Sequence, residues 1–515
     1  MTELGFWTIA AADPGRMAVV DAEERTTTFG ELLVVSNQVA HGLRALGLQR
    51  GDGIAVVLPN DQAFLELYLA ATQIGLYITP VNFHLTGPEI AYILGDAEAK
   101  ALVAGERYAD VATAAADEAG LPAEACFAVG KVKGFRPYEE LKDGQPTEPP
   151  PDRTAGQTML YTSGTTGRPK GVRRPLPEAD PDTAASLAAL LASLFDVEAG
   201  TGVHLVAGPL YHAAPLAFGT GALHLGQGDV LMDKWTPERT LELIERYRVT
   251  SSHMVPTMFH RLLALPDEVK ARYDVSSLRN VIHAAAPCPV DVKRRMIEWW
   301  GPVIYEYYAA TEGGGTYVKP NEWLDRPGTV GRAFPGATIK ILDDDGNECP
   351  PGTSGTVYMG SAIGAFEYYK DPEKTANSRR GDLFTVGDVG YLDEDGWLFL
   401  NDRKADMIIS GGVNIYPTEI EAALLSHPSV GDAAVFGVPN EEWGEEVKAV
   451  VQPAEGVEPS PELAEDLVVH CRSRLAGYKV PRSVDFRAEL PRYPTGKLYK
   501  RLLRDEYWRG RERQI

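Results

Sequence analysis

One run of twelve residues, 161–172, reads YTSGTTGRPKGV and constrains this 515-residue chain more than any other. It follows Met159 and Leu160, which predict the end of a buried strand. Its three glycines let backbone N–H groups approach an anion and its hydroxyl groups add donors, so the run predicts a phosphate-binding loop. A plain surface turn needs only one or two such residues and is disfavoured. The expected phosphate ligands are Thr162, Ser163, Gly164, Thr165, Thr166, Gly167 and Lys170.

The run is not the nucleoside-triphosphate loop GxxxxGK[ST]. Counted from Gly164, the second glycine position holds Pro169, and Lys170 is followed by Gly171 instead of a magnesium-binding Ser or Thr. The run resembles instead the phosphate-binding signature of the adenylate-forming superfamily, which includes acyl-CoA synthetases, adenylation domains of peptide synthetases and luciferases. Four further motifs in the expected order support this resemblance.

Length and composition limit the classes of protein. A chain of 515 residues predicts two to four domains. A net charge of -22 argues against general affinity for nucleic acid or anionic membranes, because both are polyanions. Four cysteines stand far apart without CxxC spacing, so we expect neither a zinc site nor a disulfide scaffold, and a reduced cytoplasmic enzyme fits. No export signal and no membrane-spanning run is readable.

The first part of the chain alternates helices with short apolar strands. Thr28 and Glu31 predict a capping box at the start of a helix that ends at Gly47. A strand over 54–58 and a helix over 63–74 follow. This alternation predicts an α/β fold.

The segment 204–219, HLVAGPLYHAAPLAFG, places His212 where a strand is expected to end. From the residues alone, a core histidine held by a backbone carbonyl is the favoured interpretation. The resemblance implies instead that His212 lines the mouth of the acyl pocket, as a gate and not as a base. Thr236 and Pro237 then predict a helix start. The strand at 251–256 is similar to the family's pocket wall, although packing alone explains it equally well.

Two motifs resemble the family's adenine- and metal-binding segments. HAAAPCP (283–289) stands where relatives usually carry a glycine-rich run against the adenine, and Ala284 and Ala285 hold two glycine positions. YEYYAATEGGG (305–315) is the counterpart of the family's YGxTE, with Ala309 in place of the glycine. An aromatic ring over a base and a carboxylate on a hard cation are sound chemistry in themselves. The resemblance implies that Ala285, Ala286, Tyr307 and Tyr308 bind the nucleotide, that Tyr308 stacks on adenine, that Thr311 contacts the phosphate and that Glu312 holds Mg²⁺.

The segment 385–408 carries two charged candidates, Asp388 and Arg403. Either alone would be interpreted as a solvated surface charge, but their spacing matches the family. The resemblance implies that Asp388 accepts both ribose hydroxyls and that Arg403 reaches the same sugar or a phosphate. It also places a hinge at 402–406, where Ala405 stands at the position that relatives usually fill with Asp or Lys.

Two motifs lie after the hinge. SGGVNIYPTEIE (410–421) supplies Gly411 and Gly412 in a turn and predicts a helix capped near Thr418. In CoA ligases this turn forms the wall of the pantetheine tunnel. LPRYPTGKLYKRLL (490–503) places Lys497 in a basic tail, where a lone lysine is ordinarily a solvated charge. The resemblance implies that Lys497 bridges the substrate carboxylate and the α-phosphate.

The resemblance spans about residues 10 to 505. It implies an α/β N-terminal adenylation domain (1–402), with two α/β subdomains and a distorted β-barrel, and a small mobile α+β C-terminal domain (403–515). The implied activity is ATP-dependent activation of a carboxylic acid and its transfer to CoA, and expected pocket walls without a fixed cation or acid favour an apolar acyl or aryl acid. The implied catalytic residues are Lys497, Thr311, Glu312 and His212, and the implied cofactors are ATP, Mg²⁺ and CoA.

Two alternative functions and the assembly stay open at this point. The acceptor can be an amine or a carrier-protein phosphopantetheine, because these enzymes share the first half-reaction. A catalytically silent relative is disfavoured because the chain retains Lys170, Thr311, Glu312, Asp388, Arg403 and Lys497. A homodimer is left open as the assembly.

Overall fold

The computed structural model describes residues 4–162, 169–360, 366–403, 406–410, 413–440, 443–492 and 498–509, without the side chains of residues 162, 187–191 and 403. The chain forms two compact units, each described by itself below. The first contains Met1–Met254, Ala264–Ile282 and Gly364–Asn377, and the second contains Val255–Leu263, His283–Ile363 and Ser378–Ile515. The expected domain boundary after residue 402 stays a prediction. Within the described ranges no helix is long and apolar enough to cross a membrane.

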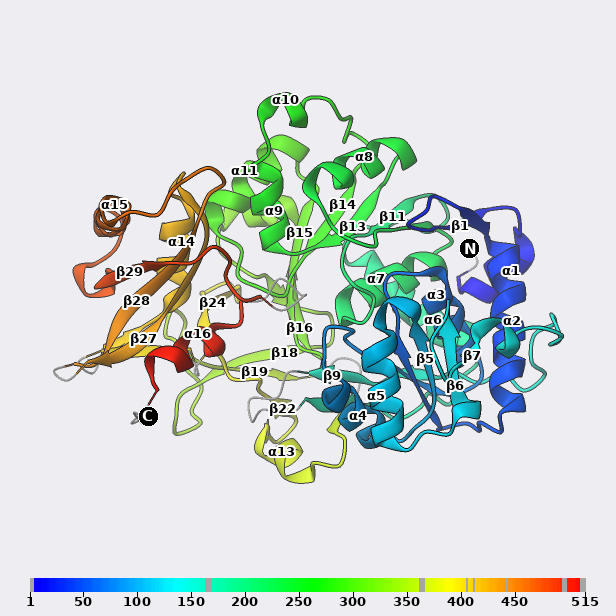
Figure 1. The fold of residues 1–515 in the computed structure, drawn as a ribbon. Coiled ribbons are helices and arrows are strands. Elements are labelled where there is room, and N and C mark those ends of the chain that lie inside the picture. Colours follow the sequence, from blue (N-terminus) through cyan, green and yellow to red (C-terminus); the bar gives the residue numbers. More distant parts are fainter. Residues whose placement is uncertain are drawn as a thin grey trace. The chain divides into compact units, whose positions relative to one another are not determined.

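The first unit contains a six-stranded parallel sheet in the order β7-β6-β5-β3-β4-β8. Figure 1 labels β5, β6 and β7 of this sheet. Helices cover both of its faces, as the burial of parallel sheets requires. Its strands are β3 (Gly53–Val57), β4 (Tyr77–Pro80), β5 (Ala99–Gly105), β6 (Cys126–Val129), β7 (Arg136–Pro137) and β8 (Gln157–Thr158), and its helices are α2 (Phe29–Ala45), α3 (Gln62–Gln73), α4 (Gly87–Asp96) and α5 (Ala109–Ala119).

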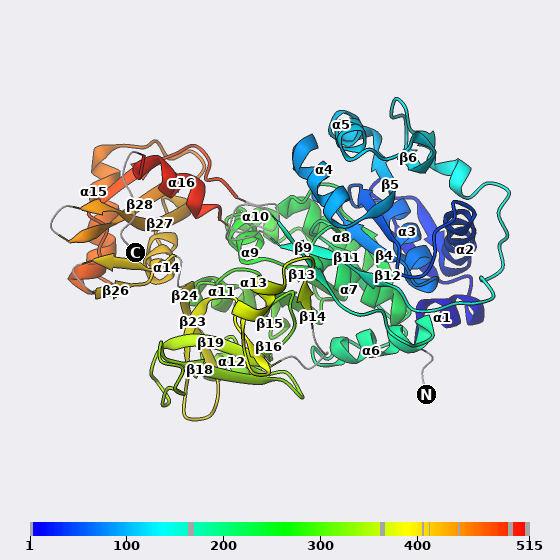
Figure 2. The same ribbon diagram turned by 90° about the horizontal axis from the view of Figure 1, so that it is seen from below.

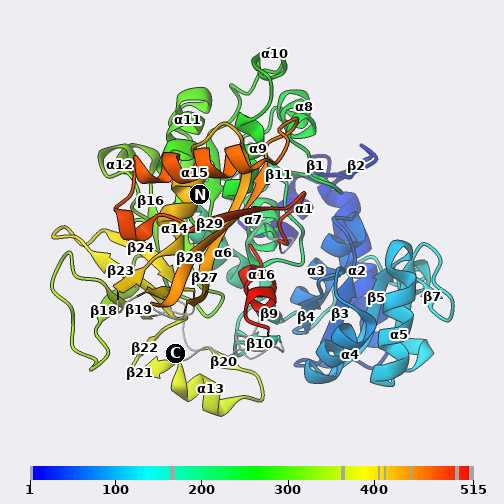
Figure 3. The same ribbon diagram turned by 60° about the vertical axis from the view of Figure 1, so that its left-hand side comes forward.

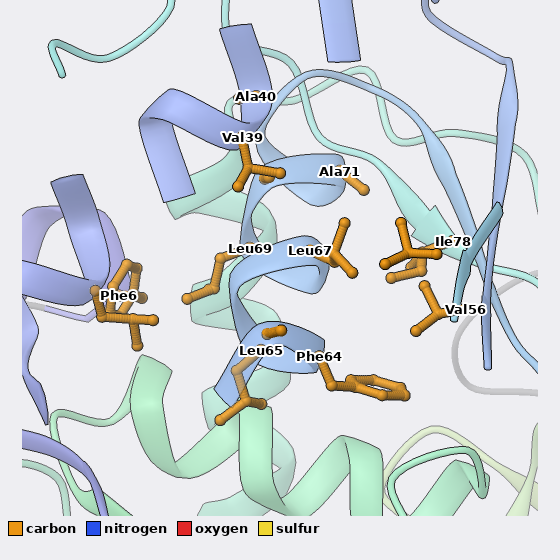
Figure 4. Packing of buried hydrophobic residues seen from close by; sticks show 14 of the residues in the cluster. Phe6, Val39, Ala40, Val56, Phe64, Leu65, Leu67, Leu69, Ala71 and Ile78 are labelled. Atoms are coloured by element: carbon orange, nitrogen blue, oxygen red, sulfur yellow. The ribbon is translucent and has the colours of Figure 1, made fainter. Parts of the chain in front are cut away.

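Alternate residues of β3 face opposite sides of this sheet. Ile54 and Val56 pack in one core with α2 and α3, while Ala55 and Val57 pack in another with α4 and α5. Figure 4 shows the first core, in which side chains of α3 point toward Val56 and toward Ile78 of β4. The predicted α/β class is confirmed by this arrangement.

The first unit also contains strands of a second, mostly parallel sheet. Strands β13 (Ser251–Met254), β11 (Val203–Val206), β12 (Gly228–Leu231) and β1 (Met17–Val20) are parallel, and β2 (Thr26–Thr28) joins in antiparallel pairing. Helix α7 (Ala213–His224) packs on β11 and β12. The remaining elements here are α1 (Phe6–Ala12), α6 (Pro181–Ser193), α8 (Pro237–Tyr247), α10 (Asp267–Lys270) and β14 (Asn280–His283).

A small antiparallel sheet of the first unit flanks the phosphate-loop signature. Strand β9 (Leu160–Thr162) ends before it, β10 (Lys170–Arg173) begins after it, and Lys170 pairs with Thr162. A third strand, β20 (Glu367–Tyr368), pairs with β10 and leads into α13 (Pro372–Asn377).

The second unit begins with an antiparallel ladder of β15 (Ile304–Ala309), β16 (Gly315–Val318) and β17 (Arg332–Ala333). Figure 2 shows a further antiparallel sheet in which β18, β19, β23 and β24 lie side by side. Its strands are β18 (Thr338–Leu342), β19 (Gly355–Gly360), β21 (Arg379–Arg380), β22 (Leu383–Phe384), β23 (Asp388–Leu392) and β24 (Leu398–Arg403), and the helices of this part are α9 (Pro256–Leu263), α11 (Val290–Trp300) and α12 (Pro320–Asp325).

The last part of the second unit is a five-stranded sheet with helices on both faces (Figure 3). Along β27, Ala433 and Val435 face the core of α14 and α15, whereas Ala434 and Phe436 face α16. The elements are β25 (Ile408–Ser410), β26 (Val413–Ile415), β27 (Val430–Asn440), β28 (Gly444–Pro453), β29 (Ser483–Phe486), α14 (Pro417–Leu425), α15 (Pro461–Arg472) and α16 (Lys500–Tyr507).

Candidate active site

Of the expected phosphate-loop ligands, Lys170 is the one whose side chain is described. Ser163, Gly164, Thr165, Thr166 and Gly167 lie outside the described residues, and only the backbone of Thr162 is inside them. The Lys170 Nζ atom lies 2.9 Å from the Asp371 Oδ2 atom, within the first unit. This contact raises the pKa of Lys170 and lowers the pKa of Asp371.

Two of the expected nucleotide-binding side chains meet in the second unit. The Tyr308 hydroxyl donates a hydrogen bond of 2.6 Å to the Asp388 Oδ2 atom, although the residues are 80 positions apart. Asp388 is buried, with 8% of its surface exposed. Arg403 lies directly opposite Asp388 in the β23–β24 ladder, so the backbone sets these two positions side by side. The structure thus brings together the Tyr308 ring, the Asp388 carboxylate and the backbone of Arg403.

Tyr307 differs from its neighbour in direction. Successive side chains of a strand point to opposite faces, so Tyr307 and Tyr308 leave different faces of β15. Tyr307 is register partner of Tyr317, and burial raises its pKa. A nucleotide contact of Tyr307 stays a prediction.

Thr311 and Glu312 lie in the tight turn that joins β15 to β16. The turn closes with a hydrogen bond from the Gly313 N–H to the Ala310 carbonyl, 3.0 Å long. It is built for glycine: Gly315 has φ 152, and a Cβ there would meet the Tyr308 carbonyl oxygen at 2.3 Å. Glu312 is buried, with 5% of its surface exposed, so the turn holds a carboxylate out of bulk water.

The donor chemistry of this turn fits Mg²⁺. A carboxylate and a hydroxyl are oxygen ligands of the kind that Mg²⁺ prefers, and this ion usually binds one or two carboxylates together with phosphates and waters. Among the described residues no group of three or more His, Cys, Asp or Glu side chains forms a metal site. Glu312 stays a candidate ligand for Mg²⁺ shared with a phosphate.

The adenine-loop alanines occupy unequal conformations. Ala285 has φ 75, in the left-handed region, and its side chain is exposed. Ala286 is half-buried and is not among the positive-φ residues of the described chain. The left-handed conformation explains why this resembles a glycine position, because only glycine adopts it without strain.

His212 sits at the N-cap position of α7 but makes no capping hydrogen bond. Its ring centroid is 4.2 Å from that of Tyr211. Burial, with a smaller effect from His84, lowers the pKa of His212 to about 3. The imidazole is therefore neutral at pH 7 and a weak proton acceptor, which disfavours a role as a base, and its role as a gate stays a prediction.

Lys497, Gly411 and Gly412 lie outside the described residues, as does the side chain of Arg403. The helix expected near Thr418 begins at Pro417, and no side chain at its N-cap position, Tyr416, caps it. The proline sets the first helical φ, and the Asp402 carboxylate accepts from the backbone N–H of Thr418 at 3.0 Å and from its hydroxyl at 2.9 Å. The helix start predicted near Thr418 is therefore observed, and the acceptor that caps it is the Asp402 carboxylate.

Two residues of interest escaped the sequence motifs. Asp371 is one, because its contact with Lys170 joins segments that are remote in the chain. Trp443 is the other: it is 47% exposed and precedes Gly444, which pairs with Ser410 just before the expected glycine turn. No sequence signal indicated either residue, because neither the contact of Asp371 nor the exposure of Trp443 follows from a spacing.

Comparisons with known proteins identify the family of this chain. A family model described as AMP-binding enzyme matches residues 6–369, and one described as AMP-binding enzyme C-terminal domain matches residues 419–497. The fatty acid–[acyl-carrier-protein] ligase ScoC of Streptomyces coeruleorubidus is 33% identical over 98% of this chain and 96% of its own. The long-chain-fatty-acid–CoA ligase FadD13 of Mycobacterium tuberculosis is 32% identical over 97% of each.

A solved structure, that of the amide bond synthetase McbA from Marinactinospora thermotolerans, is similar throughout, with a TM-score of 0.83 and 29% identity over 98% of this chain and 99% of that one. The family matches together cover most of the sequence, and the relatives match it over nearly its full length. The chain therefore belongs to the family of AMP-binding enzymes, the adenylate-forming ligases that include the acyl- and aryl-CoA synthetases.

Proposed function

We propose that this protein is an ATP-dependent, AMP-forming acid:thiol ligase. In the first half-reaction the substrate carboxylate attacks the α-phosphorus of ATP, an acyl-adenylate forms and pyrophosphate leaves. In the second, the CoA thiol loses its proton and attacks the acyl carbon, a thioester forms and AMP leaves. The detour through the adenylate is needed because a carboxylate has no adequate leaving group at neutral pH.

The observation that carries this proposal is the 2.6 Å hydrogen bond from Tyr308 to Asp388, with Arg403 opposite in the ladder. A ring face supports stacking on adenine, and a carboxylate accepts hydrogen bonds from the two ribose hydroxyls. The neighbouring turn supplies Thr311 and the buried Glu312 for a phosphate and for Mg²⁺. When bound, the metal neutralises charge on the phosphate oxygens.

The residues proposed for chemistry act by position and charge. Negative charge develops on the phosphoryl oxygens as the carboxylate attacks, and cations such as Lys170 and Lys497 favour it there. Preorganised groups of this kind contribute on the order of 3 to 4 kcal/mol each to the transition state. No side chain is required as a covalent nucleophile.

The acid is proposed to be an apolar acyl or aryl acid. The expected pocket segments, residues 212–218, Val255 and residues 313–315, contain no Asp, Glu, Lys or Arg that would bind a second charged group. His212 is neutral at pH 7, because burial lowers its pKa to about 3. An uncharged wall favours an uncharged substituent.

CoA is the proposed acceptor, and a carrier protein and an amine are the alternative acceptors that require a test. FadD13 is named for CoA, but ScoC is named for an acyl-carrier protein and McbA for amide bond synthesis, at comparable identity. These acceptors share the first half-reaction, so adenylation alone does not separate them.

The decisive experiment is a pyrophosphate-release screen over a panel of carboxylic acids with ATP and Mg²⁺. Each acid is tested alone, with CoA, with an amine and with a phosphopantetheinylated carrier protein. We expect release that depends on one class of apolar acid and acyl-CoA as the product. Acid-dependent release with an amide or a carrier thioester as the sole product would replace CoA as the acceptor, and no release with any acid would reject the ligase.

A further inference from the structure

Lys170 has a carboxylate partner that the proposed function does not use. Its Nζ atom lies 2.9 Å from the Asp371 Oδ2 atom, and the two side chains are 24% and 23% exposed. Asp96 and Tyr92 also act on Lys170 electrostatically, but Asp371 has the largest effect on its pKa. The Asp371 carboxylate is therefore the main electrostatic partner of Lys170.

Asp371 is held firmly from its own side. Its Oδ1 atom accepts from the Lys374 backbone N–H at 3.0 Å, and its carbonyl accepts from the Thr375 hydroxyl at 2.9 Å, so it caps α13. Its backbone N–H donates to the Tyr368 carbonyl at 2.9 Å. One carboxylate oxygen is thus committed to the helix and the other to Lys170.

The strand pairing then brings this carboxylate to the start of β10. Tyr368 pairs with Val172, and the Tyr369 N–H donates to the Gly171 carbonyl at 2.8 Å. The Arg173 guanidinium lies over the rings of Tyr77 and Tyr369, at 4.4 and 4.5 Å from their centroids. The backbone on both sides of the ion pair is therefore fixed, while the four-carbon stem of Lys170 is flexible.

We infer that Asp371 is a counter-ion that competes with phosphate for the ammonium group of Lys170. This inference rests on the proposed function, in which Lys170 binds a phosphate. A lysine ammonium has three donors, so Asp371 engages one and leaves others available. The donor that Asp371 engages is lost to a phosphate, and the negative charge of the carboxylate also repels the phosphate oxygens. The lost donor and the repulsion both weaken the binding of ATP and of pyrophosphate. Asp371 thus acts through Lys170: it weakens the hold of the ammonium group on phosphate and so favours the departure of pyrophosphate.

The chain offers matched variants for this inference. Asp371→Asn removes the charge and retains an N-cap acceptor for the Lys374 N–H, because Asn caps helices as well as Asp does. Asp371→Ser keeps a cap but is too short to reach Lys170. Lys170→Met removes the ammonium and keeps much of the side-chain volume.

The test measures the Kd of pyrophosphate, and separately of Mg-ATP, for the full-length protein by titration calorimetry at low and high salt. Asp371→Asn and Asp371→Ser are both expected to bind about two- to fivefold more tightly, the range typical of partly exposed ion pairs. The gain should shrink at high salt, where such charges are screened. In the Lys170→Met background the gain from Asp371→Asn should be smaller, since only the repulsion remains to be removed.

Three results would overturn the inference: weaker binding by Asp371→Asn, an unchanged gain without Lys170, or no pyrophosphate binding by the wild type. Thermal unfolding separates a capping effect, because Asp371→Asn and Asp371→Ser should unfold near the wild-type temperature. Acid-dependent pyrophosphate exchange by the wild type reports on the ligase proposal separately. Binding without exchange would reject the ligase, while the sign of the Asp371→Asn change would still decide the role of Asp371.

Discussion

Ala285 has a Cβ atom in a backbone conformation that favours glycine. Its φ of 75 lies in the left-handed region, where a Cβ costs roughly 1 to 2 kcal/mol. Glycine avoids that strain but gains freedom in the unfolded chain, which offsets about 0.4 to 1 kcal/mol. We therefore expect Ala285→Gly to raise the free energy of unfolding by about 0.5 to 1 kcal/mol, measured by urea denaturation.

The adjacent alanine is the matched control for this prediction. Ala286 is not among the positive-φ residues, so Ala286→Gly should destabilise the protein by about 0.5 to 1 kcal/mol through unfolded-state entropy alone. Equal effects of the two glycines would show that the conformation of Ala285 stores no strain.

Asp229 is a second residue in an unfavourable environment, because its burial disfavours the charged form of the carboxylate. It lies on β12 with no exposed surface, and neither carboxyl oxygen has a hydrogen-bond partner among the described residues. Burial raises its pKa well above the ordinary value. The folded state therefore binds this proton more tightly than the unfolded state, whose pKa is about 3.9. Stability is lost as the pH rises above that value toward the folded pKa.

Replacing Asp229 should reverse that loss. Asp229→Val is expected to raise the free energy of unfolding at pH 7 by on the order of 1 to 3 kcal/mol, because a buried polar group without a partner disappears. Asp229→Asn removes only the titration, so it should flatten the dependence on pH and stabilise less. Urea unfolding from pH 4 to 8 checks both. An unchanged slope in both variants would show that Asp229 does not titrate differently in the folded state.

At the scale of elements, a buried ion pair joins α11 to β15. The Lys293 Nζ atom is 2.6 Å from the Glu306 Oε2 atom, and both side chains are buried. The ammonium also lies 4.7 Å from the ring centroid of Trp323, and the His283 Nε2 atom is 3.4 Å from the same Glu306 oxygen. Burial lowers the pKa of Lys293 and raises that of Glu306, so each group depends on the other for its charge.

Removing one partner should cost more than removing both. Lys293→Met is expected to destabilise by about 3 to 5 kcal/mol, because it leaves an uncompensated buried charge. Lys293→Met combined with Glu306→Leu should recover most of that loss. Denaturant unfolding of the two single variants and the double variant gives the comparison, and additive losses would contradict the coupling.

Local sequence signals predicted elements better than the contacts between them. The Thr28–Glu31 capping box is confirmed, with the Glu31 N–H at 3.2 Å from the Thr28 hydroxyl, because all its donors and acceptors lie within one turn. Helix α8 begins at Pro237 as predicted, but the Thr236 side chain makes no capping hydrogen bond. The cap from Asp402 to Thr418 crosses from a strand to a helix and has no local signature.

At the scale of the whole molecule, the candidate site could be named from the sequence in part only. The motifs identified Tyr308 and Asp388, and the structure shows them in contact. The Lys170–Asp371 and Lys293–Glu306 pairs were not predicted, since strand and helix packing brings them together and neither pair follows a sequence spacing. The family resemblance predicted the roles of the motif residues, whereas the fold was needed to identify the side chains that contact them.

The last part of the chain carries Lys497 and Gly412, the residues expected to serve the two half-reactions. The Lys500 Nζ atom lies 2.9 Å from the Glu421 Oε1 atom, which ties α16 to α14, and Leu503 packs with Phe436 of β27. Lys497 lies just before α16, and Gly412 lies between two strands of the same sheet. We propose that both residues move with this packed body, and that a rotation about residues 402–406 would exchange them at the site.

That connection predicts a split effect for Lys497→Ala. Adenylation should fall by about 100- to 1,000-fold, the usual loss when a preorganised electrostatic group is removed. Conversion of supplied acyl-adenylate and CoA to thioester should be nearly unchanged. Lys500→Ala is the control, because it leaves the half-buried Glu421 without its cation and should lower stability and both half-reactions alike. Equal loss of both steps in Lys497→Ala would contradict the exchange.

Gly412→Leu should show the reciprocal pattern. A pantetheine arm is long and thin, and a tunnel built for it leaves no room for a side chain where the backbone turns across its path. We expect acid-dependent pyrophosphate exchange to persist while thioester formation from CoA is lost. The competing explanation is that the glycine serves only the turn, in which case replacement would disturb the whole packed body and damage both half-reactions. Measuring the two steps separately, together with the unfolding temperature, distinguishes a blocked tunnel from a misfolded domain.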